Sequence, residues 1–441
     1  MKIPDFAAFR RSLSSAGPVL LSLLLGAVLV GCGGGGGGEA AGTAGVCDPD
    51  DGGLSLPDGF CATVVADSLG PTRHLAVADN GDVYAAVQEV TNGGGVVALR
   101  DEDGDYKADR TEYFGDVGGT GIALRDGYLY LGPNDGVVRY AKSSDEFVPS
   151  GEKEEIVSLP DQDSHAAKPI DFDGNGNLYV NVGAPSNACM EESRTKGSPG
   201  QDPCPLLEEH GGIWQYDADA TGQEHSPDAR YASGLRNTVA LTWNDAQDNL
   251  YALQHGRDQL HSFFPDLFTQ EESAELPAEE FFKVDEGDDF GWPYCYYNWM
   301  TKQKLLNPEY GGDRETVGRC EQFEDPIQAF PGHWAPNDVL FYDGDQFPEE
   351  YRGGAFIAWH GSWNRAPLPQ EGFKVTYTSF ENGSPAGNFE VFADGFPGVP
   401  NPSNAEHRPT GLAVGPDGGL YVSDDAGGTI WRIAYVGEDG S

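Results

Sequence analysis

One pattern of apolar and polar positions recurs along the chain. In each copy an alternating apolar segment leads into a turn rich in Gly, Asn or Asp, and a second segment with an aromatic residue follows. The copies are Leu75–Tyr84, Ile122–Tyr130, Ile170–Tyr179, Val239–Tyr251, Val339–Ile357 and Leu412–Tyr421. Alternation on both sides of such a turn predicts a hairpin of two strands.

The spacing of the copies predicts the architecture. Successive aromatic positions lie 46, 49, 72, 105 and 65 residues apart. The shorter spacings suit one four-stranded propeller blade, and the longer ones suit blades that hold insertions. Six copies therefore predict an all-β, six-bladed β-propeller over residues 47–441. A β-sandwich or a pair of barrels offers no reason for one motif to recur across the whole body.

Two insertions break the regular spacing, at residues 187–210 and 257–300. The first carries two cysteines, and the second is rich in acidic and aromatic residues. Functional groups of propellers lie mostly in loops at one face. Both insertions are long enough to wall a pocket over the central channel.

The first 46 residues do not share the repeat. A basic start precedes the apolar run 18–30, which is too short to span a bilayer and has the length of a signal-peptide core. The run ends in Leu29–Cys32, which resembles a bacterial lipobox. We therefore expect a signal peptide over 1–31, a lipid on Cys32 and a glycine-rich tether over 32–46. The alternative is an ordinary secretory signal with a chance cysteine. The expected location is the cell envelope, outside the cytoplasm.

Composition limits the partners. The chain has 71 acidic and 27 basic residues, a net charge of −44. Such a charge excludes nucleic acid and an anionic membrane surface as partners, so membrane contact is expected only through the lipid. Most of the acidic residues are spread along the chain, which favours a solvation role over a reservoir of cation ligands.

Six cysteines follow Cys32, an even number that suggests disulfides in an exported chain. Fifteen connectivities are possible. Pairing of sequence neighbours is our prediction, because each pair brackets a loop-like stretch. The pairs are Cys47–Cys61, Cys189–Cys204 and Cys295–Cys320. The sequence has no Cys-x-x-Cys-His motif, so covalent c-type haem is not indicated.

An acidic loop gives the sharpest local motif. Oxygen ligands fall at positions 1, 3, 5, 7, 9 and 12 of a calcium loop of the EF-hand type. The candidate ligands are Asp101, Asp103, Asp105, the Lys107 carbonyl, Asp109 and Glu112. Tyr106 stands where that motif has its turn glycine, and Gly104 is expected to absorb part of the bend. We predict a structural Ca²⁺ here; the alternative is a solvated acidic hairpin.

Polar residues precede or end several repeats, where a propeller would direct them at its axis. His165 precedes the third repeat, Arg236 the fourth, His360 ends the fifth and Arg408 begins the sixth. Singly, each of them could be a satisfied turn residue. Together they predict a cationic pocket in a very acidic protein, and buried arginine forks bind carboxylates through paired hydrogen bonds.

The order of longer phrases resembles a known family over residues 54–436. The phrases are Pro-x-Arg-His-Leu-Ala-Val (71–77), His-x-x-Lys (165–168), Gly-Leu-Arg-Asn (234–237), Gly-Arg-Asp (256–258), Phe-Gly-Trp-Pro-Tyr-Cys (290–295), His-Gly-Ser-Trp-Asn-Arg (360–365) and Arg-Pro-x-Gly-Leu-Ala-Val-Gly-Pro-Asp-Gly (408–418). This set is similar to the sorbosone dehydrogenase-like sugar dehydrogenases, which depend on the quinone cofactor PQQ, and to the soluble glucose and aldose dehydrogenases.

The resemblance implies a mechanism. A sugar or an aldehyde would lose hydride to PQQ, with Ca²⁺ polarising the quinone and His165 as the general base. A Ca²⁺ ion in this position is held largely by backbone carbonyls in such relatives. The separate electron acceptor would be a quinone or a cytochrome. The implied cofactor-binding residues are Arg73, Lys168, Arg236, Asn237, His360, Arg365, Lys374 and Arg408.

Two departures from the family pattern matter. Lys168 stands where an arginine is expected, which keeps the charge but loses the bidentate fork. The turn that carries a catalytic aspartate in soluble glucose dehydrogenases reads Gly183-Ala184, so an orienting carboxylate would have to come from elsewhere, for example Asp163. Two other functions stay open: a non-catalytic sugar- or ligand-binding propeller, and a calcium-dependent lactonase-like hydrolase. A hydrolase has no need for several arginine clamps.

Overall fold

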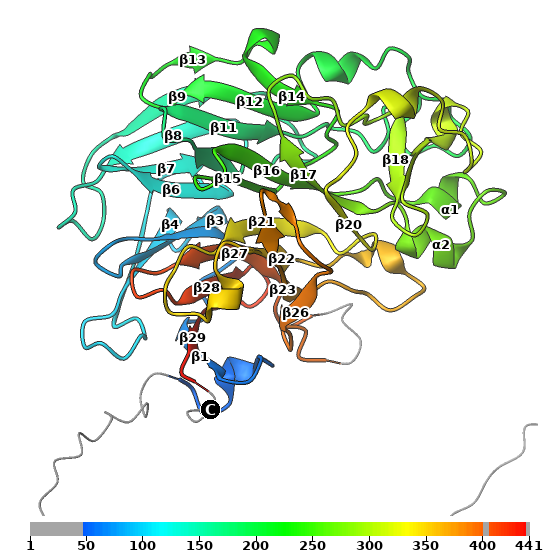
Figure 1. Ribbon diagram of the computed structural model, residues 1–441. Helices are drawn as coiled ribbons and strands as arrows, with labels where there is room; N and C mark the ends of the chain where they lie inside the picture. The colour runs from blue at the N-terminus through cyan, green and yellow to red at the C-terminus, as the bar shows by residue number, and fades with distance from the viewer. Residues whose placement is uncertain (1–46, 400–404, 438–441) are drawn as a thin grey trace, which may run out of the picture. The chain divides into compact units, whose positions relative to one another are not determined.

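The computed structural model describes residues 47–399 and 405–437, all within one compact unit, Thr43–Ser441. The expected signal peptide, Cys32 and the whole expected tether lie outside the described residues. Six antiparallel sheets follow one another along the chain, each built on four strands (Figure 1). The predicted six-bladed propeller is therefore confirmed.

The first three blades follow the sequence order. Blade 1 contains β2 (Thr72–Val77), β3 (Val83–Thr91), β4 (Gly94–Arg100) and β5 (Arg110–Phe114). Blade 2 contains β6 (Gly121–Arg125), β7 (Tyr128–Gly132), β8 (Gly136–Ala141) and β9 (Lys153–Ser158), with β13 (Gln223–Glu224) added in parallel to β9. Blade 3 contains β10 (Ile170–Phe172), β11 (Asn177–Val182), β12 (Gly212–Asp217) and β14 (Arg230–Ser233).

The last three blades hold the longest insertions. Blade 4 contains β15 (Ala240–Asn244), β16 (Asn249–Gln254), β17 (Glu279–Val284) and β20 (Gln328–Phe330). Blade 5 contains β21 (Pro336–Phe341), β22 (Ala355–Trp359), β23 (Lys374–Thr378) and β26 (Glu390–Ala393). Blade 6 contains β27 (Pro409–Val414), β28 (Leu420–Asp424), β29 (Ile430–Tyr435) and β1 (Phe60–Ala66).

Short elements fill the connections. The helices are α1 (Leu260–Phe263), α2 (Gln270–Glu275), η1 (Asp51–Gly53), η2 (Pro205–Glu208), η3 (Pro227–Ala229), η4 (Pro308–Tyr310), η5 (Gly318–Gln322), η6 (Glu349–Tyr351) and η7 (Trp363–Arg365). Two hairpins are β18 (Cys295–Asn298) with β19 (Gln303–Leu306), and β24 (Phe380–Glu381) with β25 (Ser384–Pro385). Among the described helices, none is long and apolar enough to cross a membrane.

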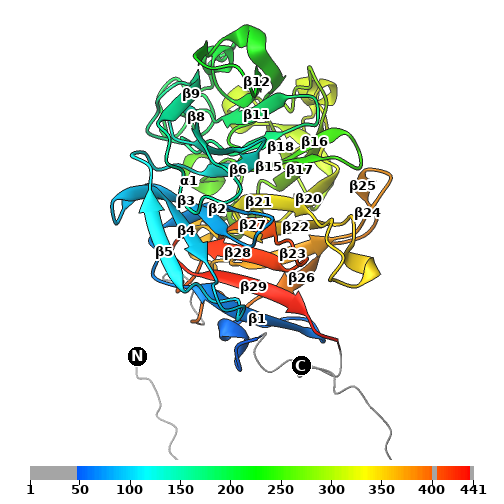
Figure 2. The same cartoon turned by 90° about the vertical axis from the view of Figure 1, so that its left-hand side faces the viewer.

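The ring closes through the N-terminal strand. The innermost strands β2, β6, β10, β15, β21 and β27 each contact the next, and β27 contacts β2. β1 pairs with β29 in antiparallel register from Phe60↔Tyr435, so blade 6 takes strands from both ends of the described chain (Figure 2). The sequence repeat did not predict this closure, because β1 lies before the first copy.

The recurring aromatic residues join neighbouring blades. Each lies on the second strand of its blade and is at most 5% exposed. The hydroxyl of Tyr84 donates to the carbonyl of Phe147 (2.8 Å), and that of Tyr130 donates to the carbonyl of Ala218 (3.0 Å), in each case in the following blade. Burying such a ring stabilises the fold by about 2 kcal/mol, and the hydroxyl finds its required partner. The repeat is therefore a blade-to-blade contact as well as a hairpin.

All three predicted disulfides are present. They join Cys47–Cys61, Cys189–Cys204 and Cys295–Cys320. The second closes the insertion that carries Arg194, and the third ties the β18–β19 hairpin to η5. Both of these insertions are thus covalently braced.

Candidate functional site

The predicted axial residues converge at one end of the channel. An innermost strand begins where its antiparallel partner ends, as in the pairs Pro336↔Trp359 and Pro409↔Asp424. Residues just before the first strands and just after the second strands of successive blades therefore lie at the same end. Two groups of charged side chains gather there.

The first group, the Asp258 cluster, consists of Asp258, Arg236, Arg194, Asn187 and Asn364. One carboxylate oxygen of Asp258 accepts hydrogen bonds from Arg236 and from Arg194, both at 2.8 Å, and the other accepts one from Asn364 at 2.7 Å. Burial alone would raise the pKa of Asp258, but Arg236 and its neighbours hold it well below its ordinary value. Asp258 is therefore the anionic centre of the cluster.

His165 is positioned by backbone groups. Gln162 donates to the carbonyls of His165 (3.0 Å) and Gly183 (2.8 Å), which holds the loop against β11. Nδ1 of His165 lies 2.5 Å from the carbonyl oxygen of Ala184. A carbonyl only accepts, so Nδ1 carries the proton and Nε2 keeps its lone pair. The amide of Ala184 in turn donates to the carbonyl of Arg236 (2.8 Å), which links this loop to the Asp258 cluster.

Two effects keep the His165 imidazole neutral. Burial and the nearby Arg236 guanidinium lower its pKa to about 3. The group that orients the ring is the Ala184 carbonyl, rather than a carboxylate such as Asp163. Gly183 is required here, because a Cβ at this position would lie 2.7 Å from the His165 carbonyl and 2.8 Å from the side chain of Asn237.

The second group, the Asp425 cluster, consists of Asp425, His360, Arg73 and Arg408. The carboxylate of Asp425 lies 2.8 Å from Nε2 of His360 and 2.7 Å from Arg73. Arg408 donates to the His360 carbonyl at 3.1 Å. Burial opposes ionisation of Asp425, but His360 and the two arginines lower its pKa to about 2. The Nε atom of Arg73 is buried without a hydrogen-bond partner among the described residues.

Two further histidines connect the inner strands. Nε2 of His74 donates to the carbonyl of Asn337 (2.7 Å), and Nε2 of His255 donates to the carbonyl of Pro336 (2.8 Å). Burial lowers the pKa of each to about 4, so both are neutral donors. The amide of His255 donates to the carbonyl of Asn237 (2.8 Å), which places His255 beside the Asp258 cluster.

The structure does not bring every predicted residue to this site. Lys168 is fully buried, its ammonium donates to the Ala166 carbonyl (2.7 Å), and the acidic charges acting on it are those of Asp135 and Asp161. Burial lowers its pKa to about 8. Arg365 donates to Glu275 and to three carbonyls, so its guanidinium braces loops. Lys374 lies over the ring of Trp334, 3.6 Å from Glu371.

Several residues of the clusters carried no role in the sequence prediction. Asp258 and Asp425 are two of 71 acidic residues, so nothing in the composition distinguishes them as members of a site. Asp258 stands in the Gly-Arg-Asp phrase, which was the one available signal. Arg194 and His255 are brought to the site by the Cys189–Cys204 loop and by the end of β16. Asn237, a predicted cofactor-binding residue, follows Arg236 in the chain and is buried, with its side chain next to Gly183.

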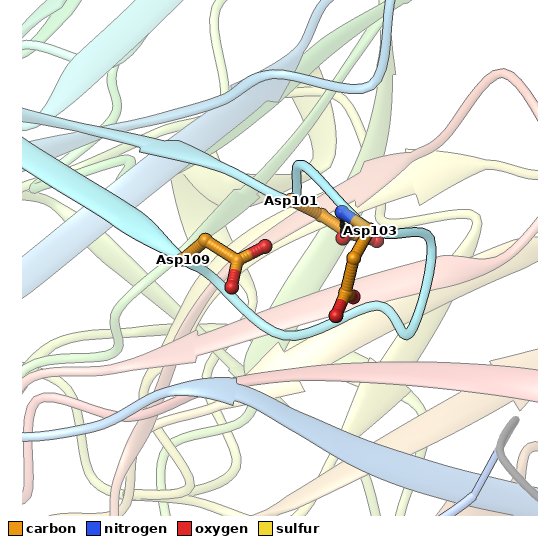
Figure 3. Close-up of side chains that lie close together, drawn as sticks. All are labelled: Asp101, Asp103 and Asp109. Atoms are coloured by element: carbon orange, nitrogen blue, oxygen red, sulfur yellow. Dashed lines mark hydrogen bonds between the residues drawn. The ribbon is translucent and has the colours of Figure 1, made fainter.

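The acidic loop lies elsewhere, between β4 and β5 (Figure 3). Carboxylate oxygens of Asp101, Asp103 and Asp109 lie within 4.8 Å of one another, so these three could hold a cation. Tyr106 adopts the left-handed conformation (φ 64°) that the motif assigns to glycine, and Gly104 is also left-handed (φ 85°).

Most of the predicted carboxylate ligands also accept hydrogen bonds within the loop. Asp101 accepts from the amides of Asp103, Gly104 and Tyr106, and Asp105 accepts from the amide of Lys107. Glu112 on β5 pairs with Arg110. The calcium site stays a prediction.

Comparisons with known proteins agree with this architecture. The TrAA12-like family model matches residues 54–436. The chain is 27% identical over 234 residues to a pyrroloquinoline quinone-dependent pyranose dehydrogenase of Coprinopsis cinerea, covering 45% of this chain and 30% of that protein. It is 23% identical over 221 residues to a pyrroloquinoline quinone-dependent sugar dehydrogenase of Hypocrea jecorina, covering 47% and 49%.

A solved structure shows the same fold. The holo form of the PQQ domain of the Coprinopsis cinerea pyranose dehydrogenase superposes with a TM-score of 0.70 at 19% identity, over 86% of this chain and 97% of that chain. The matches to the curated relatives span half of their length or less.

Proposed function

Because the chain belongs to the TrAA12-like family, we propose that it is a PQQ-dependent dehydrogenase that oxidises a sugar or an aldehyde. One observation carries the proposal: the clusters place four guanidinium groups against two carboxylates, beside imidazoles held neutral. This is an excess of two positive charges in a chain whose net charge is −44. Such a site is built to receive an anion.

The residues present fit a tricarboxylate quinone. Arg236, Arg73 and Arg408 would hold carboxylates of PQQ, with Asn237 and His360 beside them. The unpartnered Nε of buried Arg73 supports this, since buried donors normally have an acceptor. When bound, PQQ supplies a quinone that takes up the hydride of the substrate. A Ca²⁺ ion on backbone carbonyls is part of the proposal, and the sugar that is oxidised would be of the sorbosone or aldose type.

His165 performs the proton transfer in this proposal. Its Nε2 is the free acceptor, because Nδ1 donates to the Ala184 carbonyl. A low pKa keeps the ring ready to accept a proton at neutral pH, when a substrate hydroxyl or aldehyde hydrate loses its proton as the hydride leaves. A quinone or a cytochrome would serve as the separate electron acceptor.

Reconstitution tests the proposal. Purified protein would be titrated with PQQ and Ca²⁺ by absorbance and calorimetry, then assayed with aldoses and aldehydes and an artificial dye. We expect stoichiometric PQQ binding, and turnover that falls at least 100-fold in His165→Ala. His261→Ala is the matched control: that ring also binds a backbone carbonyl (Phe268, 2.7 Å), but in α1. Absence of quinone binding would refute the enzyme, and full turnover in His165→Ala would refute the base.

We also propose that the protein is lipid-anchored in the cell envelope through Cys32. The support is the apolar run that ends in Leu-Val-Gly-Cys and the glycine-rich tether after it. Cys32→Ala should shift the protein from the membrane to the soluble fraction. An unchanged membrane fraction would contradict the anchor.

A further inference from the structure

Among the residues that the structure describes, Trp363 is the one exposed tryptophan. Its exposed fraction is 67%, whereas the other seven tryptophans are buried or partly buried. A single exposed apolar residue is ordinary on a protein surface and needs no explanation by itself. The position of this one, between the two charged clusters, is what calls for an explanation.

The segment that carries Trp363 crosses from one cluster to the other. At its start, Arg408 donates to the carbonyls of His360 (3.1 Å) and Gly361 (2.6 Å), within the Asp425 cluster. At its end, Asn364 donates to Asp258 (2.7 Å). The backbone at Trp363 therefore lies between the hydrogen bonds that tie this segment to the two clusters.

The same segment is firmly held. Ser362 caps the short helix η7 by accepting from the amide of Asn364 (3.2 Å). Arg365 is buried and donates to the carbonyls of Ala274 (2.8 Å) and Gly332 (3.1 Å). The residues on both sides of Trp363 are thus held by hydrogen bonds to the protein, while the indole itself is exposed to solvent. A tryptophan side chain has only two rotatable torsions, so ordering it on binding costs little entropy.

We propose that Trp363 is a stacking platform for a second sugar unit, so that the substrate class is a saccharide of two or more units. This inference rests on the proposed function. The ring that is oxidised has to contact groups that are mostly buried, such as Arg236 and His165. A ring lying on an indole that is two-thirds exposed is therefore a further unit of the same substrate. The flat indole face complements the C–H face of a pyranose, as aromatic side chains do in binding sites.

The test compares substrates of different length on the PQQ-loaded enzyme. The probes are glucose, maltose and maltotriose, assayed with a dye acceptor, on Trp363→Ala and Trp363→Phe. Met300→Ala is the matched control, since Met300 is 50% exposed but lies at the β18–β19 turn. We expect Trp363→Ala to lower kcat/KM for maltose relative to glucose by about tenfold, mainly through KM. Trp363→Phe should recover most of the loss, and Met300→Ala should leave the ratio unchanged.

A second readout does not need turnover. Calorimetric binding of maltotriose to the protein should weaken about tenfold in Trp363→Ala. An equal loss for glucose and maltose, or no loss for either, would overturn the proposal. A raised KM for the acceptor with unchanged sugar kinetics would also overturn it and assign Trp363 to acceptor docking. Failure of PQQ binding would instead refute the proposed function, and the PQQ titration detects that failure independently of the sugar kinetics.

Discussion

Asp258→Asn tests whether the charge of Asp258 stabilises the buried Arg236. The substitution keeps the shape of the side chain and removes a negative charge that lies 2.8 Å from a guanidinium only 4% exposed. Removing one partner of a buried ion pair costs about 3–5 kcal/mol, because the other charge is left without a counterion. Arg194 contributes little, since 43% of its side chain is exposed and solvent screens it. We expect the free energy of unfolding of the PQQ-free protein to fall by about 3 kcal/mol.

Denaturant unfolding, followed by fluorescence, measures this loss. Asp202→Asn is the matched control: its pair with Arg319 has 47% and 38% of the two side chains exposed and should be worth less than about 1 kcal/mol. Bound PQQ would bring a new negative charge to Arg236, so PQQ with Ca²⁺ should restore more stability to Asp258→Asn than to the wild type. A loss no larger than that of Asp202→Asn, or equal stabilisation of both proteins by PQQ, would refute the reasoning.

Three further predictions concern pH and calcium. Because burial and Arg236 lower the pKa of His165 to about 3, its imidazole in the PQQ-free protein should stay neutral when NMR follows it down to about pH 5; protonation near the ordinary imidazole value of about 6.5 would contradict the assignment. Burial lowers the pKa of His74 in the folded protein to about 4, below its value of about 6.5 in the unfolded chain. The stability that depends on neutral His74 is therefore complete above about pH 6.5 and is lost as the pH falls toward 4, by about 1.4 kcal/mol per pH unit. His74→Asn should flatten the slope of unfolding free energy against pH in this range, and an unchanged slope would exclude this role. If Asp101, Asp103 and Asp109 bind Ca²⁺ with a Kd of about 10 µM, then about 1 mM Ca²⁺ should stabilise the protein by about 2.7 kcal/mol. Asp103→Asn should abolish this stabilisation without loss of PQQ binding. Equal stabilisation of the variant and the wild type would refute the site.

The fold was predictable because its repeating unit is local. Each copy of the pattern is the pair of innermost strands of one blade, and its aromatic residue joins that blade to a neighbour. Neighbouring cysteines paired as expected for the same reason, since each pair brackets a single loop. The closure of the ring was not predictable, because β1 meets β29 across almost the whole chain and carries no copy of the pattern.

The site was predictable only in part. Positions at strand ends indicate which end of the channel a residue occupies, and this placed His165, Arg236, His360 and Arg408 at one end, whereas Arg73 came only from the family resemblance. They do not indicate which way a long side chain turns. Lys168 is fully buried among other groups, and Arg365 turns into the α2 loop, although both stand in phrases of the family pattern. The counterions Asp258 and Asp425 were hidden by the abundance of acids.

The two clusters and the base are physically coupled. After burial, the Arg236 guanidinium is the largest cause of the low pKa of His165, and Asp258 opposes it only in part. The arginines that make the site bind an anion therefore also keep the neighbouring imidazole unprotonated when the site holds none. An anion bound at Arg236 offsets that guanidinium and makes His165 a stronger base. Cofactor binding and base strength would thus rise together, which explains why a proton acceptor is placed beside a cationic pocket, where its own protonation is disfavoured.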